Sequence, residues 1–353
     1  MTAQGLDAIP RRQLGFTGPE LTRIGLGTWA IGGPWRFGWG PVDDEESIAA
    51  IRHAIASGIN WVDTAPIYGL GHAEEVVGRA LDGYAVGEDV FVATKCGRRS
   101  EPDGSIVSDL RPDSIRSECE RSLRRLGVER LDLYQIHWPD FDSGTSLEES
   151  WSALATLVDE GKIRWLGVSN FDVGQLDRCE RIRHVDSLQP PLSIVRQGAL
   201  RTTIRWAVEH RTGVVTYSPM ASGLLTGTFD LTRLASLSTD DVRHGKSEFR
   251  EPELSRNLAL VERLRGIAQD LGVGVAGLAV AWVLAQEGVT AAIVGARRPQ
   301  QIEEWLGAAR LILPAEVLSA IDEAVAETGA GSDDPPALPA SASSAARDEA
   351  GRP

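Results

Sequence analysis

Several segments with the composition of short apolar strands end on a polar or ionisable side chain. Asp63, Lys95 and His137 end three of these segments, and Tyr68 lies in the loop after Asp63. The remaining polar strand ends are Ser169 with Asn170, Gln189, and Tyr217. Chance explains a few such coincidences, but the complete set indicates one site to which many strand ends contribute.

These residue types suit the transfer of a proton to an oxyanion. Tyrosine has an ordinary pKa of about 10, and a cation beside it favours the phenolate and lowers that pKa. Lys95 can be that cation, with Asp63 holding the lysine in place, and His137 can donate a hydrogen bond to a carbonyl oxygen. The set therefore predicts protonation of the oxyanion that forms when hydride reaches a carbonyl carbon.

Lysine is rare in this chain. Lys95, Lys162 and Lys246 are its three lysines among 36 lysine and arginine residues. A sequence that avoids lysine keeps it where arginine cannot substitute, as where a compact charge tunes a neighbouring group in a tight site. The competing explanation is a compositional bias with three chance survivors.

The elements that carry these residues alternate between short apolar strands and amphipathic helices. The predicted strands are Ile24–Gly27, Asn60–Asp63, Val90–Thr94, Leu131–His137, Arg164–Ser169, Ser187–Gln189, Val214–Tyr217 and Ala291–Val294. The predicted helices include Asp44–Ser57, Arg111–Leu126, Leu147–Glu160, Leu200–His210 and Arg256–Leu271. Eight such units predict an α/β fold, a (β/α)8 TIM barrel whose catalytic side chains gather at the carboxyl ends of the strands.

An open doubly wound sheet is the competing layout. The run from Gly25 to Ala30 fits the GxGxxA dinucleotide fingerprint after a strand. That fingerprint must open directly into a helix, whereas here it leads into IGGPWRFGWGPVDD, which is rich in glycine and proline. We therefore predict a loop and treat the match as chance.

The barrel is predicted to occupy residues 1–328, with an N-terminal β-hairpin around the turn GFTGPE and long strand-end loops. Residues 329–353 are rich in Pro, Ala, Ser and Gly, which predicts a disordered tail. The connection from Gly223 to Glu253 is long for a barrel, and long loops in compact domains are often lids.

Composition narrows the function. The formal net charge of −14 disfavours a nucleic-acid partner, and no apolar stretch reaches the length of a membrane span. The N-terminal sequence lacks an apolar signal core, so we expect a cytoplasmic protein. The three cysteines, Cys96, Cys119 and Cys179, are too widely spaced for a disulfide framework or a zinc site, and no metal is expected.

At the polar strand ends the sequence resembles the aldo-keto reductases. The similar segments are INWVDTAPIYG with GHAEEVVGRAL, VATKC, LDLYQIHWPD, GKIRWLGVSNF, TYSPMASGLLTG and IVGARRPQQIEE. They follow the family's order over residues 14–321 and resemble the bacterial and potassium-channel-subunit branch. The resemblance implies reversible hydride transfer between NADP(H) and a small-molecule carbonyl or alcohol substrate.

The resemblance also implies roles for individual residues. The catalytic tetrad falls on Asp63, Tyr68, Lys95 and His137. The cofactor contacts fall on Gly27, Thr28, Trp29, Asp63, Ser169, Asn170, Gln189, Tyr217, Ser218, Pro219, Met220, Ser222, Gly223, Leu224, Gly295, Ala296, Arg297, Gln301 and Glu304. By the same resemblance, Ser169, Asn170 and Gln189 hold the nicotinamide carboxamide and Tyr217 stacks on its ring. The contacts from Ser218 to Leu224 line the pyrophosphate, and those from Gly295 to Glu304 surround the adenosine 2′-phosphate end. The substrate contacts fall on Trp29, Trp35, Tyr68, His137 and Trp138.

Two departures from the family pattern affect the cofactor end of the site. Many members carry Lys-Ser where this chain has Gly295 and Ala296, and Trp305 stands where an asparagine commonly contacts the adenine. Arg297, with Arg298 beside it, is the compensating charge, and guanidinium suits phosphate. We therefore expect a moderate preference for NADPH.

Two other functions compete with this one. The first is an NADPH-binding sensor or regulatory subunit with little turnover, which the intact tetrad disfavours. The second is a barrel lyase or aldolase in which Lys95 forms a Schiff base, but it leaves the cofactor-like segments around Tyr217 and Arg297 without a role. Among the other ionisable residues, we expect His72 to cap a helix or face solvent, and Glu74 and Glu75 to be a first-turn helix pair.

Overall fold

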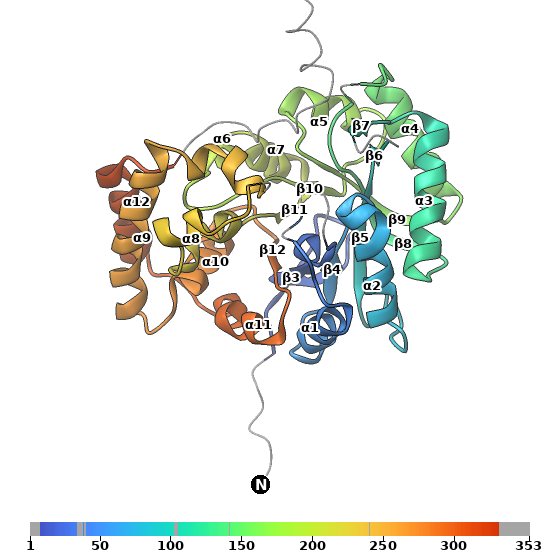
Figure 1. The fold of residues 1–353 in the computed structure, drawn as a ribbon. Coiled ribbons are helices and arrows are strands. Elements are labelled where there is room, and N and C mark those ends of the chain that lie inside the picture. Colours follow the sequence, from blue (N-terminus) through green and yellow to red (C-terminus); the bar gives the residue numbers. More distant parts are fainter. Residues whose placement is uncertain are drawn as a thin grey trace, which may run out of the picture.

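The computed structural model describes residues 8–33, 38, 40–101, 105–140, 142–239 and 241–331, and within them eight parallel strands close into a barrel (Figure 1). The order around the barrel is β10-β11-β12-β3-β4-β5-β8-β9. The strands are β3 (Ile24–Gly27), β4 (Trp61–Asp63), β5 (Phe91–Cys96), β8 (Leu131–Ile136), β9 (Ile163–Ser169), β10 (Ser187–Gln189), β11 (Gly213–Thr216) and β12 (Ala291–Gly295). Each overlaps a predicted strand, so the predicted (β/α)8 barrel is confirmed.

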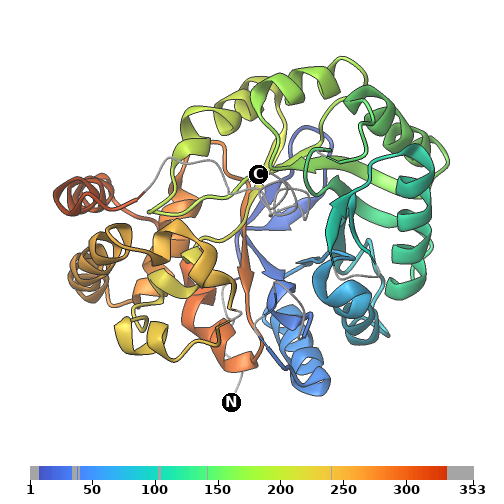
Figure 2. The ribbon, with the colours of Figure 1, turned by 45° about the horizontal axis from the view of Figure 1, so that its top comes forward.

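Helices surround the strands (Figure 2). They are α1 (Asp44–Ala56), α2 (His72–Ala80), α3 (Pro112–Leu126), α4 (Leu147–Asp159), α5 (Val173–Glu180), α6 (Gly198–Arg201), α7 (Thr203–His210), α8 (Leu231–Ala235), α9 (Glu253–Asp270), α10 (Val275–Ala285), α11 (Pro299–Leu306) and α12 (Ala315–Thr328). Local signals set their ends: Asp43 accepts a hydrogen bond from the Glu46 amide before α1, and Gly127 ends α3 in the left-handed conformation. The helix predicted from 200 to 210 is divided into α6 and α7.

The alternation of side chains along each strand separates two environments. On β5, Val92 and Cys96 pack outward with the helices in the large core. Ala93 lies inside the barrel, in a small cluster with Trp61, Leu133 and others. Because successive residues face opposite sides of a strand, Lys95 also points inward and Cys96 outward.

The predicted N-terminal hairpin closes one end of the barrel. Strands β1 (Arg11–Gln13) and β2 (Glu20–Thr22) pair antiparallel, and Leu14 and Leu21 join the small interior cluster. The Trp61 indole donates a hydrogen bond to the Thr22 carbonyl at 2.9 Å. A second hairpin, β6 (Arg98–Ser100) with β7 (Ile106–Ser108), follows β5 and was not predicted.

The segment that resembles a dinucleotide fingerprint is a strand followed by a loop, as predicted. Gly25 and Gly27 belong to β3, only a short 3-10 turn covers Trp29–Ile31, and α1 begins at Asp44. Packing explains both glycines: a methyl group at Gly25 would lie 2.1 Å from the Trp61 ring, and one at Gly27 would lie 2.7 Å from Ile293.

The long connection after β11 is folded. It contains 3-10 turns at Ala221–Thr226, Val242–Gly245 and Ser247–Phe249, together with α8. Glu248 pairs with Arg196 at 2.5 Å, which ties this connection to the loop after β10.

At the other end of the sequence, α12 ends at Thr328 and Gly329 follows it in the left-handed conformation. Ala330 is buried, and the Gly331 amide donates to Asn257. Ordered contacts thus extend three residues beyond the predicted boundary at 328, to Gly331. The rest of the predicted tail, residues 332–353, lies outside the described residues.

No single helix in the described part of the chain is long and apolar enough to cross a membrane. Only α9 and α10 taken together, with a bend of 88° between them, meet that criterion of length and composition.

The tight packing of Gly25 gives a stability prediction. Gly25→Ala should destabilise the protein by about 1–3 kcal/mol or more, because the added methyl group overlaps the Trp61 ring inside a closed barrel. Gly266→Ala is the matched control: this glycine lies on an exposed position of α9 with open space around it, so alanine should stabilise the helix by up to about 1 kcal/mol. Urea unfolding measures both, and an unchanged midpoint for Gly25→Ala contradicts the packing argument.

Candidate active site

The four residues of the predicted tetrad lie together at the carboxyl ends of β4, β5 and β8. The Lys95 ammonium is fully buried and donates to Asp63 Oδ1 at 2.6 Å and to the Thr64 carbonyl at 2.9 Å. The same ammonium lies 5.3 Å from the centre of the Tyr68 ring. The rings of Tyr68 and His137 meet edge to face with their centres 5.7 Å apart.

A close backbone contact positions Tyr68. The loop after β4 enters a short turn, Tyr68–Gly71, in which Gly69 has a φ of 61°. A methyl group at Gly69 would lie 1.8 Å from the Gly32 carbonyl oxygen. Ile67 packs on Ala65 and on Ile106 of the β6–β7 hairpin, with the Tyr68 ring against them. The unpredicted hairpin therefore supports the loop that carries the tyrosine.

The ionisation of the site differs from the expectation in one respect. Burial, and secondly the Asp63 charge, raise the pKa of Tyr68 well above its ordinary value, whereas the sequence predicted a lowered one. Burial also lowers the pKa of Lys95, although Asp63 opposes that shift. The pKa of His137 is held well below 6.5 by burial and by the Lys95 and Arg98 charges. Both Tyr68 and His137 are therefore neutral proton donors near neutral pH.

The polar ends of the next strands form a connected hydrogen-bond network. Asn170, with a φ of 64°, donates to the His137 carbonyl and to Ser169 Oγ, and its own oxygen accepts from the Tyr217 hydroxyl at 2.8 Å. Ser169 Oγ donates to the Gln189 carbonyl. The Gln189 amide nitrogen donates to Asp63 Oδ2 at 2.9 Å. This network joins the predicted carboxamide-binding residues to the tetrad.

The sequence analysis missed the supporting roles of two residues, Gln135 and Glu74. Gln135 accepts a 3.4 Å hydrogen bond from Gln189 inside the barrel, and its inward position between Leu133 and His137 on β8 was the available signal. Glu74 is fully buried, accepts from Thr94 Oγ1 at 2.7 Å and pairs with Arg125 at 2.6 Å. Glu74 does lie in the first turn of α2, as predicted, but it also ties α2 and α3 to the residue next to Lys95.

The turn after β11 has the strained backbone of a ligand-binding loop. Ser218, Ala221 and Ser222 adopt left-handed conformations, with φ of 58°, 47° and 55°, and Gly223 follows at 95°. The left-handed backbone conformation costs free energy for residues other than glycine, and residues that adopt it are concentrated at ligand sites. Open space surrounds Gly223. The side chains of the remaining predicted contacts in this turn are less accessible to a ligand. Pro219 and Leu224 are buried, and Met220 packs against the core.

At the end of β12 the predicted adenosine contacts divide into two groups. Gly295, Arg297, Gln301 and Glu304 are exposed or partly exposed, and Gln301 accepts from the Arg297 amide at 2.8 Å. Ala296 and Trp305 are buried in the large core, so Trp305 packs inside the protein. Arg298 forms a 3.0 Å ion pair with Glu46.

The donor set fits a dinucleotide laid along the barrel rim. Amide groups and the Tyr217 ring lie at the ends of β9 to β11, the strained turn follows β11, and Arg297 follows β12, the next strand around the barrel. On the other side of β12, Thr28 donates to the Asp63 carbonyl and Trp29 lies near Lys246. Gly27 serves strand packing, as described above.

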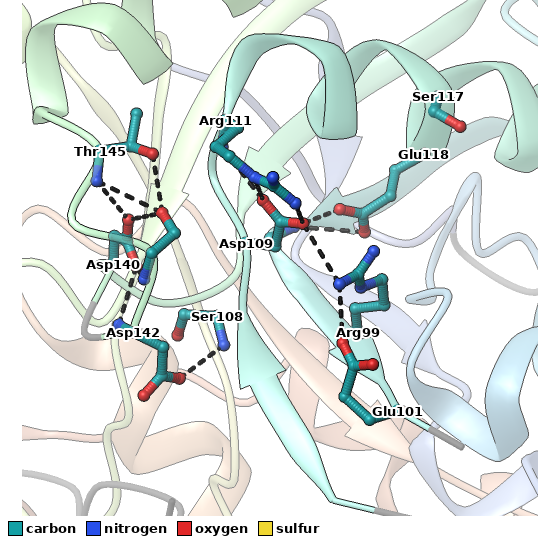
Figure 3. A network of polar contacts seen from close by, with 12 residues as sticks. Arg99, Glu101, Ser108, Asp109, Arg111, Ser117, Glu118, Asp140, Asp142 and Thr145 are labelled. Carbon is teal, nitrogen blue, oxygen red and sulfur yellow. Dashed lines mark hydrogen bonds and ion pairs between the residues drawn. The ribbon is translucent and has the colours of Figure 1, made fainter.

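A network of polar contacts holds the segments that follow β5 and β8 (Figure 3). Asp140 accepts from the Ser143 and Thr145 amides, and Asp142 accepts from the Ser108 amide, which fixes the loop that follows His137 and Trp138. Trp138 is partly exposed, whereas Trp35 lies outside the described residues. A cleft of about 970 Å³ on the outer side of the Tyr68 loop is lined by residues such as Arg98, Arg111 and Glu118 and by none of the tetrad.

The other histidines and the cysteines have structural contacts. His72 bonds to Asp44 at 2.8 Å and so joins α2 to α1, while its side chain stays partly exposed to solvent, as expected. His53 pairs with Glu303, and His184 with Glu180. The three cysteines are free and buried. In the described part of the chain, no group of three His, Cys, Asp or Glu residues could hold a metal ion.

Comparison with known proteins gives consistent matches. Residues 23–326 match the model of the aldo/keto reductase family. The chain is 37% identical over 288 residues to the aldo-keto reductase YhdN of Bacillus subtilis (strain 168), covering 81% of this chain and 85% of that protein. It is 34% identical over 314 residues to an Escherichia coli (strain K12) protein named NADH-specific methylglyoxal reductase, covering 85% and 93%. The solved structure of a Gluconobacter oxydans glycerol dehydrogenase has a TM-score of 0.81 and 37% identity, covering 95% of this chain and 100% of that one.

The buried Glu74 contact gives the second prediction. Glu74→Gln should destabilise the protein by about 3–5 kcal/mol, because it removes one partner of a buried ion pair and leaves the Arg125 charge unpaired. Glu75→Gln, at the exposed neighbouring position of α2, is the matched control and should change stability by less than about 0.5 kcal/mol. Denaturant unfolding tests both variants. A Glu74→Gln midpoint equal to that of Glu75→Gln argues against the bridging role of Glu74.

Proposed function

We propose that this chain, which belongs to the aldo/keto reductase family, transfers hydride between NADPH and the carbonyl carbon of an aldehyde or ketone. Tyr68 is the general acid. The reaction is reversible, so the same site oxidises the corresponding alcohol. The observation that carries the residue roles is the buried Asp63–Lys95 pair beneath the Tyr68 ring, with His137 against the ring edge.

The residues divide the work of carbonyl reduction. The nicotinamide, when bound, supplies the hydride. Tyr68 holds the proton for the substrate oxygen, and its raised pKa keeps it protonated until negative charge develops there. The neutral His137 imidazole donates a hydrogen bond to the same oxygen. Lys95 presents positive charge beside the phenol, which favours the phenolate left after proton transfer.

The two competing functions find less support. No comparison supports the sensor or regulatory-subunit alternative. A Schiff-base enzyme needs an uncharged amine that faces its substrate, whereas the Lys95 ammonium donates to Asp63 and to the Thr64 carbonyl and lies under the Tyr68 ring.

NADPH is the proposed cofactor because of the charges near the end of β12. Family membership does not decide between NADPH and NADH, since one relative is named NADH-specific. Arg297 is partly exposed. Burial lowers the pKa of its guanidinium the most, and the charges of Arg298, Arg243 and Arg233 lower that pKa further. An additional phosphate would relieve this repulsion between cations. Arg298, next to Arg297 in the sequence, forms an ion pair with Glu46.

Small carbonyl compounds of three carbons, ketoaldehydes and hydroxycarbonyls, are the first substrates to test. The relatives include proteins named methylglyoxal reductase and glycerol dehydrogenase. Purified protein should consume NADPH when mixed with methylglyoxal, glyceraldehyde, dihydroxyacetone or simple aldehydes. The consumption is measured as a loss of absorbance at 340 nm. No absorbance loss with a broad panel, despite tight NADPH binding, favours the sensor instead. We further propose that the protein acts in the cytoplasm.

Tyr68→Phe tests the general acid. The turnover number should fall roughly 100- to 10,000-fold, because the variant lacks the proton donor, while the dissociation constant for NADPH stays within about twofold. The ring contacts with His137 and Lys95 are retained, so the fold should be intact. Steady-state kinetics and cofactor fluorescence measure the two quantities. Wild-type turnover in the variant would mean that another group is the acid.

Arg297→Ala tests the cofactor preference. A charge-assisted hydrogen bond contributes about 1.5–3 kcal/mol, so the variant should bind NADPH roughly 10- to 100-fold more weakly and NADH almost unchanged. Raising the salt concentration should reduce the NADPH preference of the wild type, because the contact is partly exposed. Arg298→Ala is the control and should have little effect, since Glu46 neutralises that charge. Equal losses for both cofactors would make Arg297 structural, and a wild type that prefers NADH overturns the assignment.

A further inference from the structure

Lys246 brings together three segments that lie far apart in the sequence. It follows the 3-10 turn Val242–Gly245 in the folded connection after β11. Its ammonium donates to Ser222 Oγ at 2.5 Å and lies 5.9 Å from the centre of the Trp29 ring. The first contact belongs to the strained turn after β11 and the second to the loop after β3.

The barrel order places this ammonium across one particular strand end. Strand β12 lies between β11 and β3 in the sheet, and Gly295 at its end pairs with Gly27 of β3. A side chain that touches both Ser222 and Trp29 therefore spans the end of β12. On one side of this point lies the carboxamide-binding network, and Arg297 follows on the other. The middle of a dinucleotide laid along the rim is its pyrophosphate.

The charges around Lys246 leave the ammonium without an anionic partner. Glu248 pairs with Arg196 and Asp241 pairs with Arg243, and no carboxylate in the described part of the chain forms an ion pair with Lys246. Burial lowers the pKa of Lys246 to about 8; Glu248 and Asp241 act against that shift, whereas Arg196 and Arg243 add to it. A half-buried ammonium beside a hydroxyl and an aromatic ring has the surroundings of an anion-binding group.

We infer that Lys246 binds the pyrophosphate of the nicotinamide cofactor and serves NADPH and NADH alike. The inference rests on the proposed function, since it concerns the same cofactor. Lys246 differs in role from Arg297, because the pyrophosphate is common to both cofactors and the 2′-phosphate is not. It also gives the connection after β11 a chemical role: this connection delivers the cation that the turn itself lacks.

Lys246→Met, which keeps the length of the side chain and removes its charge, tests the inference. Dissociation constants for NADPH and for NADH, measured by cofactor fluorescence without any turnover, should both rise roughly 10- to 100-fold. Lys246→Arg keeps a positive charge and should recover part of the affinity. Lys162→Met is the matched control, because Lys162 pairs with Glu120 on the surface and should leave both constants unchanged.

The pH dependence of binding separates charge from packing. Phosphate binds the protonated amine more tightly, so wild-type affinity should be greatest below about pH 8 and decline as the pH rises through the pKa of Lys246. The decline should be absent in Lys246→Met and absent below about pH 10 in Lys246→Arg, whose charge persists.

Each outcome has a distinct meaning. A wild type that binds neither cofactor refutes the proposed function. A wild type that binds, with Lys246→Met equal to it in affinity and pH profile, refutes the inference alone. A loss confined to NADPH also refutes it, since Lys246 would then act on the 2′-phosphate. Thermal unfolding of each variant shows that the compared proteins are folded.

Discussion

The buried ion pair between Lys95 and Asp63 is the interaction on which the rest of the site depends. Removing two charges from water costs several kcal/mol per ion, and attraction repays this only when further hydrogen bonds satisfy the remaining atoms. Here the Thr64 carbonyl takes a second hydrogen bond from Lys95, and Gln189 donates to the second oxygen of Asp63. The ends of three strands, β4, β5 and β10, must therefore be held in fixed positions for the charged pair to persist, and a closed barrel holds them.

The barrel achieves this by separating its interior into two layers. Leu14 and Leu21 of the N-terminal hairpin fill the lower end with Trp61, Leu133 and other apolar side chains. Above them, the next inward positions on the same strands are Asp63, Lys95 and Gln135. The apolar layer excludes water from below, which lowers the pKa of Lys95 and raises that of Tyr68. The ionisation of the site is thus a consequence of how the barrel is closed.

Much of this arrangement was readable from the sequence, because strand ends and their polar residues follow local rules. The eight strands and the inward placement of Lys95 needed only the alternation of side chains. Contacts between segments that are distant in the sequence could not be predicted from it. Glu74 has the position of a first-turn residue, and only the structure shows its contacts with Thr94 and Arg125. The raised pKa of Tyr68 was missed for the same reason, since the lysine effect is visible in a motif and the extent of burial is not.

The distribution of lysine has a physical explanation in this chain. At Lys95 a compact ammonium reaches one carboxylate and one carbonyl oxygen inside the barrel, where the wider guanidinium group would need more donors satisfied. At Lys246 a single ammonium touches a hydroxyl and a ring in a narrow span. Lys162, on the surface, pairs with Glu120 and has no such constraint. Two of the three lysines thus stand where a compact charge is held by a few contacts, whereas arginine would bring five donors that need partners.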